Sequence, residues 1–97
     1  MSQKSEKNVE SHLVAKLEQM GLPCLKFIPD QLPGMPDRLV ILPGGRVVWV
    51  ELKTVGGRLS QLQRYRHKCL SEMGHQVYTV WAVEQADELA EKLQSEM

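Results

Sequence analysis

Three charged side chains fall where the sequence otherwise predicts buried β-strands. Residues 46–53 read RVVWVELK, and the alternation of side chains along a strand puts Glu51 and Lys53 on the same face. Asp37 begins the preceding strand-like run, residues 37–43. Charged side chains are rarely placed in a buried strand unless a partner or a metal ion compensates them. Asp37, Glu51 and Lys53 are therefore the first candidates for chemistry.

The loop between these two strands decides whether the acids meet. A two-residue turn at Gly44-Gly45 would pair Asp37 with Leu52 and point it away from Glu51. A three-residue loop, Pro43–Gly45, would instead place Asp37 opposite Glu51, and its last residue is a glycine, as such hairpin loops require. A β-bulge between the strands would have the same effect.

Two adjacent carboxylates repel each other unless a cation lies between them. Oxygen ligands without Cys or His favour Mg²⁺ or Mn²⁺ over zinc, and the backbone carbonyl of Leu52 can supply a further oxygen. Lys53 can orient or deprotonate a water and offset charge on a phosphate. This combination favours phosphodiester hydrolysis. The alternative is structural: a Glu51–Lys53 ion pair on an edge strand, with Asp37 capping a turn.

The surrounding pattern predicts a single α/β domain over residues 1–97, with its core at about 5–96. A central mixed β-sheet flanked by helices follows from the order α-β-β-β-α-β-α. The expected elements are a helix at 5–20, strands at 22–28, 37–43 and 46–53, a helix that Ser60 opens and Gly74 ends, a strand at 76–82 and a helix at 84–96. The apolar positions are expected at Leu62, Cys69, Leu70 and Met73 in the second helix, and at Ala86, Leu89, Ala90 and Leu93 in the last.

Charge is unevenly distributed along a chain whose formal net charge is zero. Residues 46–68 carry six basic side chains and one acid, whereas residues 69–97 carry one basic side chain and six acids. A concentrated basic segment is an electrostatic footprint for phosphates, although a solvated helix face would look the same. The wide spacing of Cys24 and Cys69 indicates reduced core residues rather than a metal knuckle. With neither a signal peptide nor a membrane-length apolar run, we expect a cytoplasmic protein.

Three motifs in order resemble one nuclease family. GMPD at 34–37, VELK at 50–53 and RLSQLQ at 58–63 are similar to the VRR-Nuc domain of the PD-(D/E)XK superfamily, in its small standalone phage and bacterial form. The resemblance runs from Glu10 to about Ala82. It implies a restriction-endonuclease-like fold and Mg²⁺-dependent cleavage of DNA, with Mn²⁺ as a substitute, in a bacterial or phage-infected cell.

The resemblance also implies roles for individual residues. Asp37, Glu51 and the Leu52 carbonyl would hold the metal, and Lys53 would serve catalysis. Glu10 would act in the outer shell or at a second metal, and Gln63 would position water or phosphate. A Glu in the first turn of a helix and a Ser60–Gln63 capping box are the ordinary alternatives for these two. The expected nucleic-acid contacts are Arg58, Ser60, Arg64, Arg66 and Lys68.

The implied substrate is a four-way (Holliday) or other branched DNA junction, cut by a homodimer. Trp49, Tyr78 and Trp81 are candidates for the dimer interface, with the core of the chain itself as the favoured alternative. Two other functions stay open: a non-catalytic nucleic-acid-binding module, and a restriction-type nuclease with sequence specificity.

Overall fold

The fold of residues 6–97, described by a computed structural model, has the predicted element order. Residue 5, where the first helix was expected to begin, lies outside the described residues. A 3₁₀ turn at Pro43–Gly45 joins the second and third strands. The elements are α1 (Glu6–Gln19), β1 (Cys24–Lys26), β2 (Arg38–Leu42), β3 (Arg46–Leu52), α2 (Gln61–Glu72), β4 (Gln76–Val80) and α3 (Val83–Ser95).

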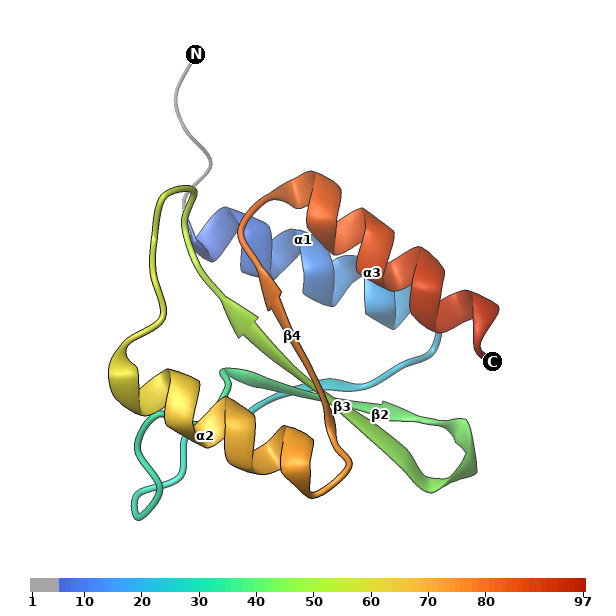
Figure 1. Cartoon of the computed structure of the whole chain (residues 1–97). Helices are drawn as coiled ribbons and strands as arrows, with labels where there is room; N and C mark the ends of the chain where they lie inside the picture. Colours follow the sequence, from blue (N-terminus) through green and yellow to red (C-terminus); the bar gives the residue numbers. More distant parts are fainter. Residues whose placement is uncertain (1–5) are drawn as a thin grey trace.

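The four strands form one mixed sheet in the order β1-β2-β3-β4. The first three strands pair antiparallel, and β4 runs parallel to β3 after the α2 crossover (Figure 1). In the β2–β3 hairpin, Leu42 pairs with Arg46, so the loop holds three residues. Gly44 and Gly45 have φ of 80° and 75°, a conformation that glycine adopts without a steric penalty. Of the alternatives that the sequence left open, the structure therefore has the three-residue loop.

The main hydrophobic core lies between the sheet and the helix pair α1 and α3, which lie side by side (Figure 1). The strands contribute alternate residues to this core, as the pleat requires, and α3 contributes the four positions expected from its sequence. No residue of α2 belongs to this core cluster. Its members are Val9, Leu13, Leu17, Leu22, Cys24, Val40, Leu42, Val48, Val50, Leu52, Val80, Ala86, Leu89, Ala90 and Leu93.

Helix α2 covers the other face of the sheet, and its orientation corrects one prediction. Leu62 and Met73, expected as apolar contacts, are 40% and 70% exposed. Leu70 is buried as predicted, and the other buried side chain of α2 is His67, which was not expected. Consecutive helical residues are about 100° apart, so a sheet-facing row through Gln63, His67 and Leu70 turns Leu62 and Met73 to the side.

Some local details differ from the sequence-based expectations. Strand β1 is shorter than predicted, because the amide of Leu22 still bonds to the carbonyl of Leu17 at the end of α1. Both cysteines are free, but Cys69 is only partly buried. Trp49 packs within the chain, edge-on to Phe27. Among the described helices, none is both long and apolar enough to cross a bilayer.

Candidate active site

Asp37 is fixed against β3 by a backbone hydrogen bond. The amide of Leu52 donates to Oδ2 of Asp37 at 2.9 Å. The hairpin register, in which Arg38 pairs with Val50, places Asp37 opposite Glu51 when it is extended by one residue. The two carboxylates predicted to converge are thus brought together at the end of the hairpin.

The backbone carbonyl of Leu52 faces the same site. Within a strand, the N–H and C=O of one residue point to the same side, and the Leu52 N–H points toward Asp37. The ladder position opposite Leu52 is occupied by Pro36, which has no N–H to donate. Strand β2 therefore donates no hydrogen bond to the Leu52 carbonyl oxygen. This leaves the oxygen free of the β2–β3 ladder, which metal ligation would require.

Glu51 is the most deeply buried charged residue of the site, with 1% of its surface exposed. Burial, reinforced by the neighbouring Asp37 carboxylate, raises its pKa to about 8, while Lys53 acts in the opposite direction. Nζ of Lys53 lies 3.6 Å from Oε2 of Glu51. The carboxyl pair therefore resists carrying two negative charges unless a cation compensates them.

Gln63 links the start of α2 to the acidic pair. Its Nε2 donates to Oε2 of Glu51 at 3.1 Å, while its Oε1 accepts from the amide of Ser60. Oγ of Ser60 in turn accepts from the amide of Gln63, which completes a capping box. One side chain therefore both caps α2 and contacts Glu51.

The residues of this site fit a hard divalent cation. Two carboxylates and one carbonyl are oxygen donors of the kind that Mg²⁺ and Mn²⁺ prefer, and Oε1 of Glu51 is buried without a hydrogen-bond partner. Within residues 6–97, no three His, Cys, Asp or Glu side chains form a metal cage by themselves. In proteins, Mg²⁺ keeps several waters and binds through one or two carboxylates.

Glu10 is paired with Arg38. Nε of Arg38, the residue after Asp37, donates to Oε2 of Glu10 at 2.8 Å. Arg38 also donates to the carbonyl of Cys24, so it joins α1 to β1 and β2. Glu10 and Arg38 line a pocket together with Lys7 and Lys26. This ion pair could not be predicted from local sequence, because its partners are 28 positions apart.

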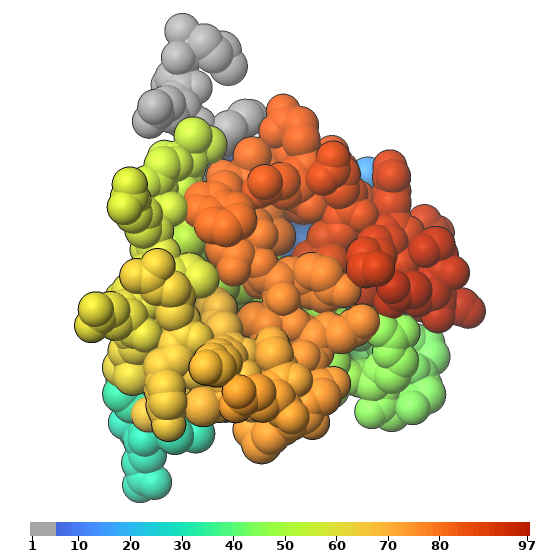
Figure 2. Space-filling view, in the orientation of Figure 1, coloured from blue at the N-terminus to red at the C-terminus, as the bar shows by residue number. Residues whose placement is uncertain are grey.

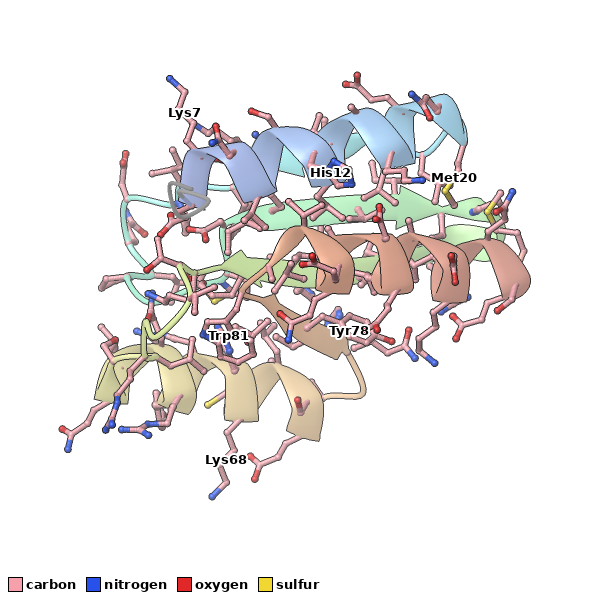
Figure 3. All side chains as sticks on the ribbon, turned by 90° about the horizontal axis from the view of Figure 1, so that it is seen from above. Lys7, His12, Met20, Lys68, Tyr78 and Trp81 are labelled. Carbon is pink, nitrogen blue, oxygen red and sulfur yellow. The ribbon has the colours of Figure 1, made fainter. Side chains whose placement is uncertain are left out.

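The predicted nucleic-acid contacts lie on α2 and in the segment just before it. Arg58, Ser60, Arg64 and Lys68 are exposed, and Figure 3 shows Lys68 pointing away from the sheet. Arg66 differs because its Nε donates to the carbonyl of Pro33, which ties the 29–36 loop to α2. In Figure 2 the segment near residue 30 protrudes beyond α2 at the lower left of the molecule.

Gly34 fixes the same loop against α2. A Cβ atom at this glycine would lie 2.8 Å from Cγ of Leu62. Its φ of 88° is also a conformation that favours glycine. The loop that leads into Asp37 is therefore docked on the helix that carries Gln63.

His67 is a site residue that the sequence analysis missed. It is buried on α2, and its Nε2 lies 3.7 Å from Oε1 of Glu51. Burial lowers the pKa of this imidazole. The sequence did contain a signal for this position. His67 is four residues after Gln63, and residues four apart share one face of a helix, so His67 could have been predicted to face the site as well.

The chain is similar to a curated protein and to a solved structure. No protein-family model matches the sequence. The chain is 39% identical over 72 residues to a curated protein of Acyrthosiphon pisum secondary endosymbiont phage 1, named "Putative nuclease p44". That match covers 74% of this chain and 77% of the phage protein.

A solved structure described as a VRR_NUC domain superposes with a TM-score of 0.83 at 28% sequence identity. The alignment covers 91% of this chain and 97% of the solved one. The chain belongs to the VRR-Nuc family of nucleases. The resemblance seen in the three motifs is thereby confirmed, and so is the restriction-endonuclease-like α/β fold.

Membership in the VRR-Nuc family gives the convergence of Asp37, Glu51 and Lys53 a chemical context. The family is a nuclease family. These three residues lie together at the end of the β2–β3 hairpin, where Gln63 in the first turn of α2 contacts Glu51. An isolated Glu51–Lys53 pair on an edge strand is excluded by the sheet order, because β3 is an inner strand.

Proposed function

We propose that this VRR-Nuc domain is a Mg²⁺-dependent, structure-selective endodeoxyribonuclease that hydrolyses phosphodiester bonds at four-way or other branched DNA junctions. The hydrogen bond from Leu52 to Asp37 carries the proposal most directly, because it fixes one carboxylate opposite the buried carboxyl of Glu51. A buried acid beside a second carboxylate and a lysine favours phosphoryl chemistry more than it favours stability. Mn²⁺ is expected to replace Mg²⁺.

The carboxylates of Asp37 and Glu51 and the carbonyl of Leu52 would hold the ion. When bound, the ion supplies Lewis-acid stabilisation of the phosphate and lowers the pKa of a water. Asp37 contributes an oxygen whose position is set by the backbone of β3. Glu51 contributes a carboxylate whose negative charge the buried surroundings disfavour in the absence of a cation.

Three further side chains support the reaction. Lys53 orients the attacking water and offsets the charge that develops on the phosphate. Gln63, which already contacts Glu51, positions water or a phosphate oxygen at the same carboxylate. Glu10 acts in the outer shell or at a second ion, and Arg38 holds it in place.

DNA binding is assigned to Arg58, Ser60, Arg64, Arg66 and Lys68. Arg64 and Lys68 are four residues apart on α2, so they share one exposed face that can follow a phosphate backbone. Phosphate contacts fix position without reading sequence. We therefore favour selection by DNA shape over sequence-specific restriction.

The working unit is proposed to be a homodimer. A four-way junction presents equivalent strands related by two-fold symmetry, and a symmetric pair of domains would deliver two sites to them. A chain of 97 residues also gains stability from burying further apolar surface. The similarity to a phage protein supports action in a bacterial or phage-infected cell, in the cytoplasm where the DNA lies.

A cleavage assay with two DNA substrates tests this function. A four-way junction and a linear duplex of the same sequence are incubated with the wild-type protein in Mg²⁺ or in EDTA. The proposal expects cleavage of the junction in Mg²⁺, little cleavage of the duplex and none in EDTA. Binding without cleavage in Mg²⁺ or Mn²⁺ would instead identify a non-catalytic module, and equal cleavage of both DNAs at one sequence would identify a restriction-type enzyme.

A further inference from the structure

His67 lies at the second oxygen of the Glu51 carboxyl group. Gln63 and Lys53 both approach Oε2, at 3.1 and 3.6 Å. Nε2 of His67 lies 3.7 Å from Oε1. Oε2 therefore faces the first turn of α2 and the end of β3, whereas Oε1 faces the middle of α2.

Neither Oε1 of Glu51 nor Nε2 of His67 has a hydrogen-bond partner among the described residues, and both atoms are buried. Buried polar atoms are nearly always hydrogen-bonded, so two that face each other without partners require an explanation. The separation of 3.7 Å is longer than a direct hydrogen bond. A small rotation of either side chain would bring the two atoms into bonding range.

An imidazole is also an unusual choice for the packing position that it occupies. The next sheet-facing residue along α2 is Leu70, which shows that an aliphatic side chain is accommodated on this side of the helix. At position 67 the side chain instead presents a nitrogen to the buried acid. Packing alone does not require that nitrogen.

We propose that His67 is a positioning residue for Glu51: its Nε2 restrains Oε1 and so fixes the rotation of the carboxyl group that is to receive the divalent ion. This inference rests on the proposed metal site. His67 contacts neither DNA nor the reacting phosphate in this role. It acts through Glu51, as partners of metal ligands commonly do.

Metal affinity measured without DNA tests the inference separately from catalysis. Mn²⁺ binding is followed by isothermal titration calorimetry for the wild type, His67→Leu and His67→Gln. The Kd for Mn²⁺ should rise about 10-fold or more in His67→Leu, and His67→Gln should recover much of the loss, since its amide can still donate to Glu51. The Mg²⁺ concentration for half-maximal cleavage should rise in parallel, while the rate at saturating Mg²⁺ changes less.

Leu70→Ala is the matched control, because it removes buried packing one turn away on the same face of α2. It should lower the melting temperature and leave the Kd for Mn²⁺ unchanged. If His67→Leu does not fold, the imidazole ¹⁵N resonances of the wild type test the inference. Addition of Mg²⁺ should then shift the Nε2 resonance of His67. The inference would be overturned by an unchanged Kd for Mn²⁺ in a folded His67→Leu protein, or by an Nε2 resonance that does not shift when Mg²⁺ is added.

The two proposals fail in different ways. A wild-type protein that binds Mn²⁺ but cleaves no DNA would refute the proposed function and leave the comparison of Kd values to decide the role of His67. A wild-type protein that binds no divalent ion would overturn both.

Discussion

The backbone amide of Leu52 donates a 2.9 Å hydrogen bond to the side chain of Asp37. In a regular antiparallel ladder this amide would donate to the carbonyl of the facing residue, which here is Pro36. A carboxylate therefore replaces a backbone acceptor at the last position of the hairpin. The hydrogen bond from Leu52 therefore holds the short side chain of Asp37 beside Glu51.

The pKa of Glu51 makes the stability of the metal-free protein depend on pH. Its folded-state pKa of about 8 is above the ordinary value of 4.5, so folding favours the protonated carboxyl. The stabilisation is complete below about pH 4.5 and is lost as the pH rises through 8. The melting temperature in EDTA should therefore fall between pH 5 and pH 8, by roughly 4–8 °C for each kcal/mol lost.

Glu51→Gln is the control for this pH dependence. It carries no titrating group at position 51, so its melting temperature should vary less over the same range. Mg²⁺ should oppose the fall in the wild type, because it binds the ionised carboxylate. A wild-type melting temperature that rises from pH 5 to pH 8 in EDTA would contradict the assigned environment of Glu51.

Replacing Lys53 should impair the chemical step more than metal binding. Lys53→Ala removes the ammonium group 3.6 Å from Glu51, and we expect a loss of about 10²-fold or more in cleavage rate. The Kd for Mn²⁺ should change little, because Lys53 is not a ligand. Single-turnover cleavage and calorimetry measure the two quantities. Lys16→Ala, an exposed α1 lysine paired with Asp87, is the control and should cleave normally.

Loss of Mn²⁺ affinity in Lys53→Ala would assign Lys53 to the metal site instead. Normal cleavage by this variant would remove it from the reaction altogether.

The basic residues on α2 and just before it should give DNA binding a steep salt dependence. If Arg58, Arg64, Arg66 and Lys68 all contact phosphates, log affinity should fall with log salt at a slope of roughly −4 per protomer. Arg64→Gln and Lys68→Gln should each reduce the slope by about 1, whereas Lys92→Gln on α3 should leave it unchanged. Fluorescence anisotropy with a labelled junction provides the measurement. A flat salt response would leave α2 as a solvated helix face.

Light scattering tests the proposed oligomeric state. At micromolar concentration the mass should be near twice 11.0 kDa, because two domains are needed to cut both strands of a symmetric junction. A mass of 11.0 kDa from a protein that makes paired, simultaneous cuts in a junction would refute the dimer.

The sequence was sufficient to predict the hairpin and the residues at its end. Pro43–Gly45 carries glycines where a three-residue loop needs positive φ, and a loop of this length places Asp37 opposite Glu51. The capping box at Ser60 was also readable, because its two partners are three residues apart. Local signals of this kind depend on neighbouring residues and backbone geometry.

The contacts that were missed join distant parts of the chain. The Glu10–Arg38 pair and the approach of His67 to Glu51 depend on how the helices settle on the sheet. The rotation of α2 was also mispredicted, because its apolar residues suggested one buried face while its polar residues line the site. A helix that serves an active site need not turn its most hydrophobic side inward.

The most direct test of the central claim separates DNA binding from cleavage at the two carboxylates. Asp37→Asn and Glu51→Gln keep the size of each side chain, and an asparagine oxygen can still accept from the amide of Leu52. Both variants and the wild type are assayed for junction affinity and for junction cleavage in saturating Mg²⁺. The account predicts affinity within about 3-fold of the wild type and a cleavage rate reduced at least about 10³-fold, since DNA affinity depends mainly on phosphate contacts. Cleavage by either variant at the wild-type rate would contradict the assignment of Asp37 and Glu51 as the metal-binding centre of this nuclease.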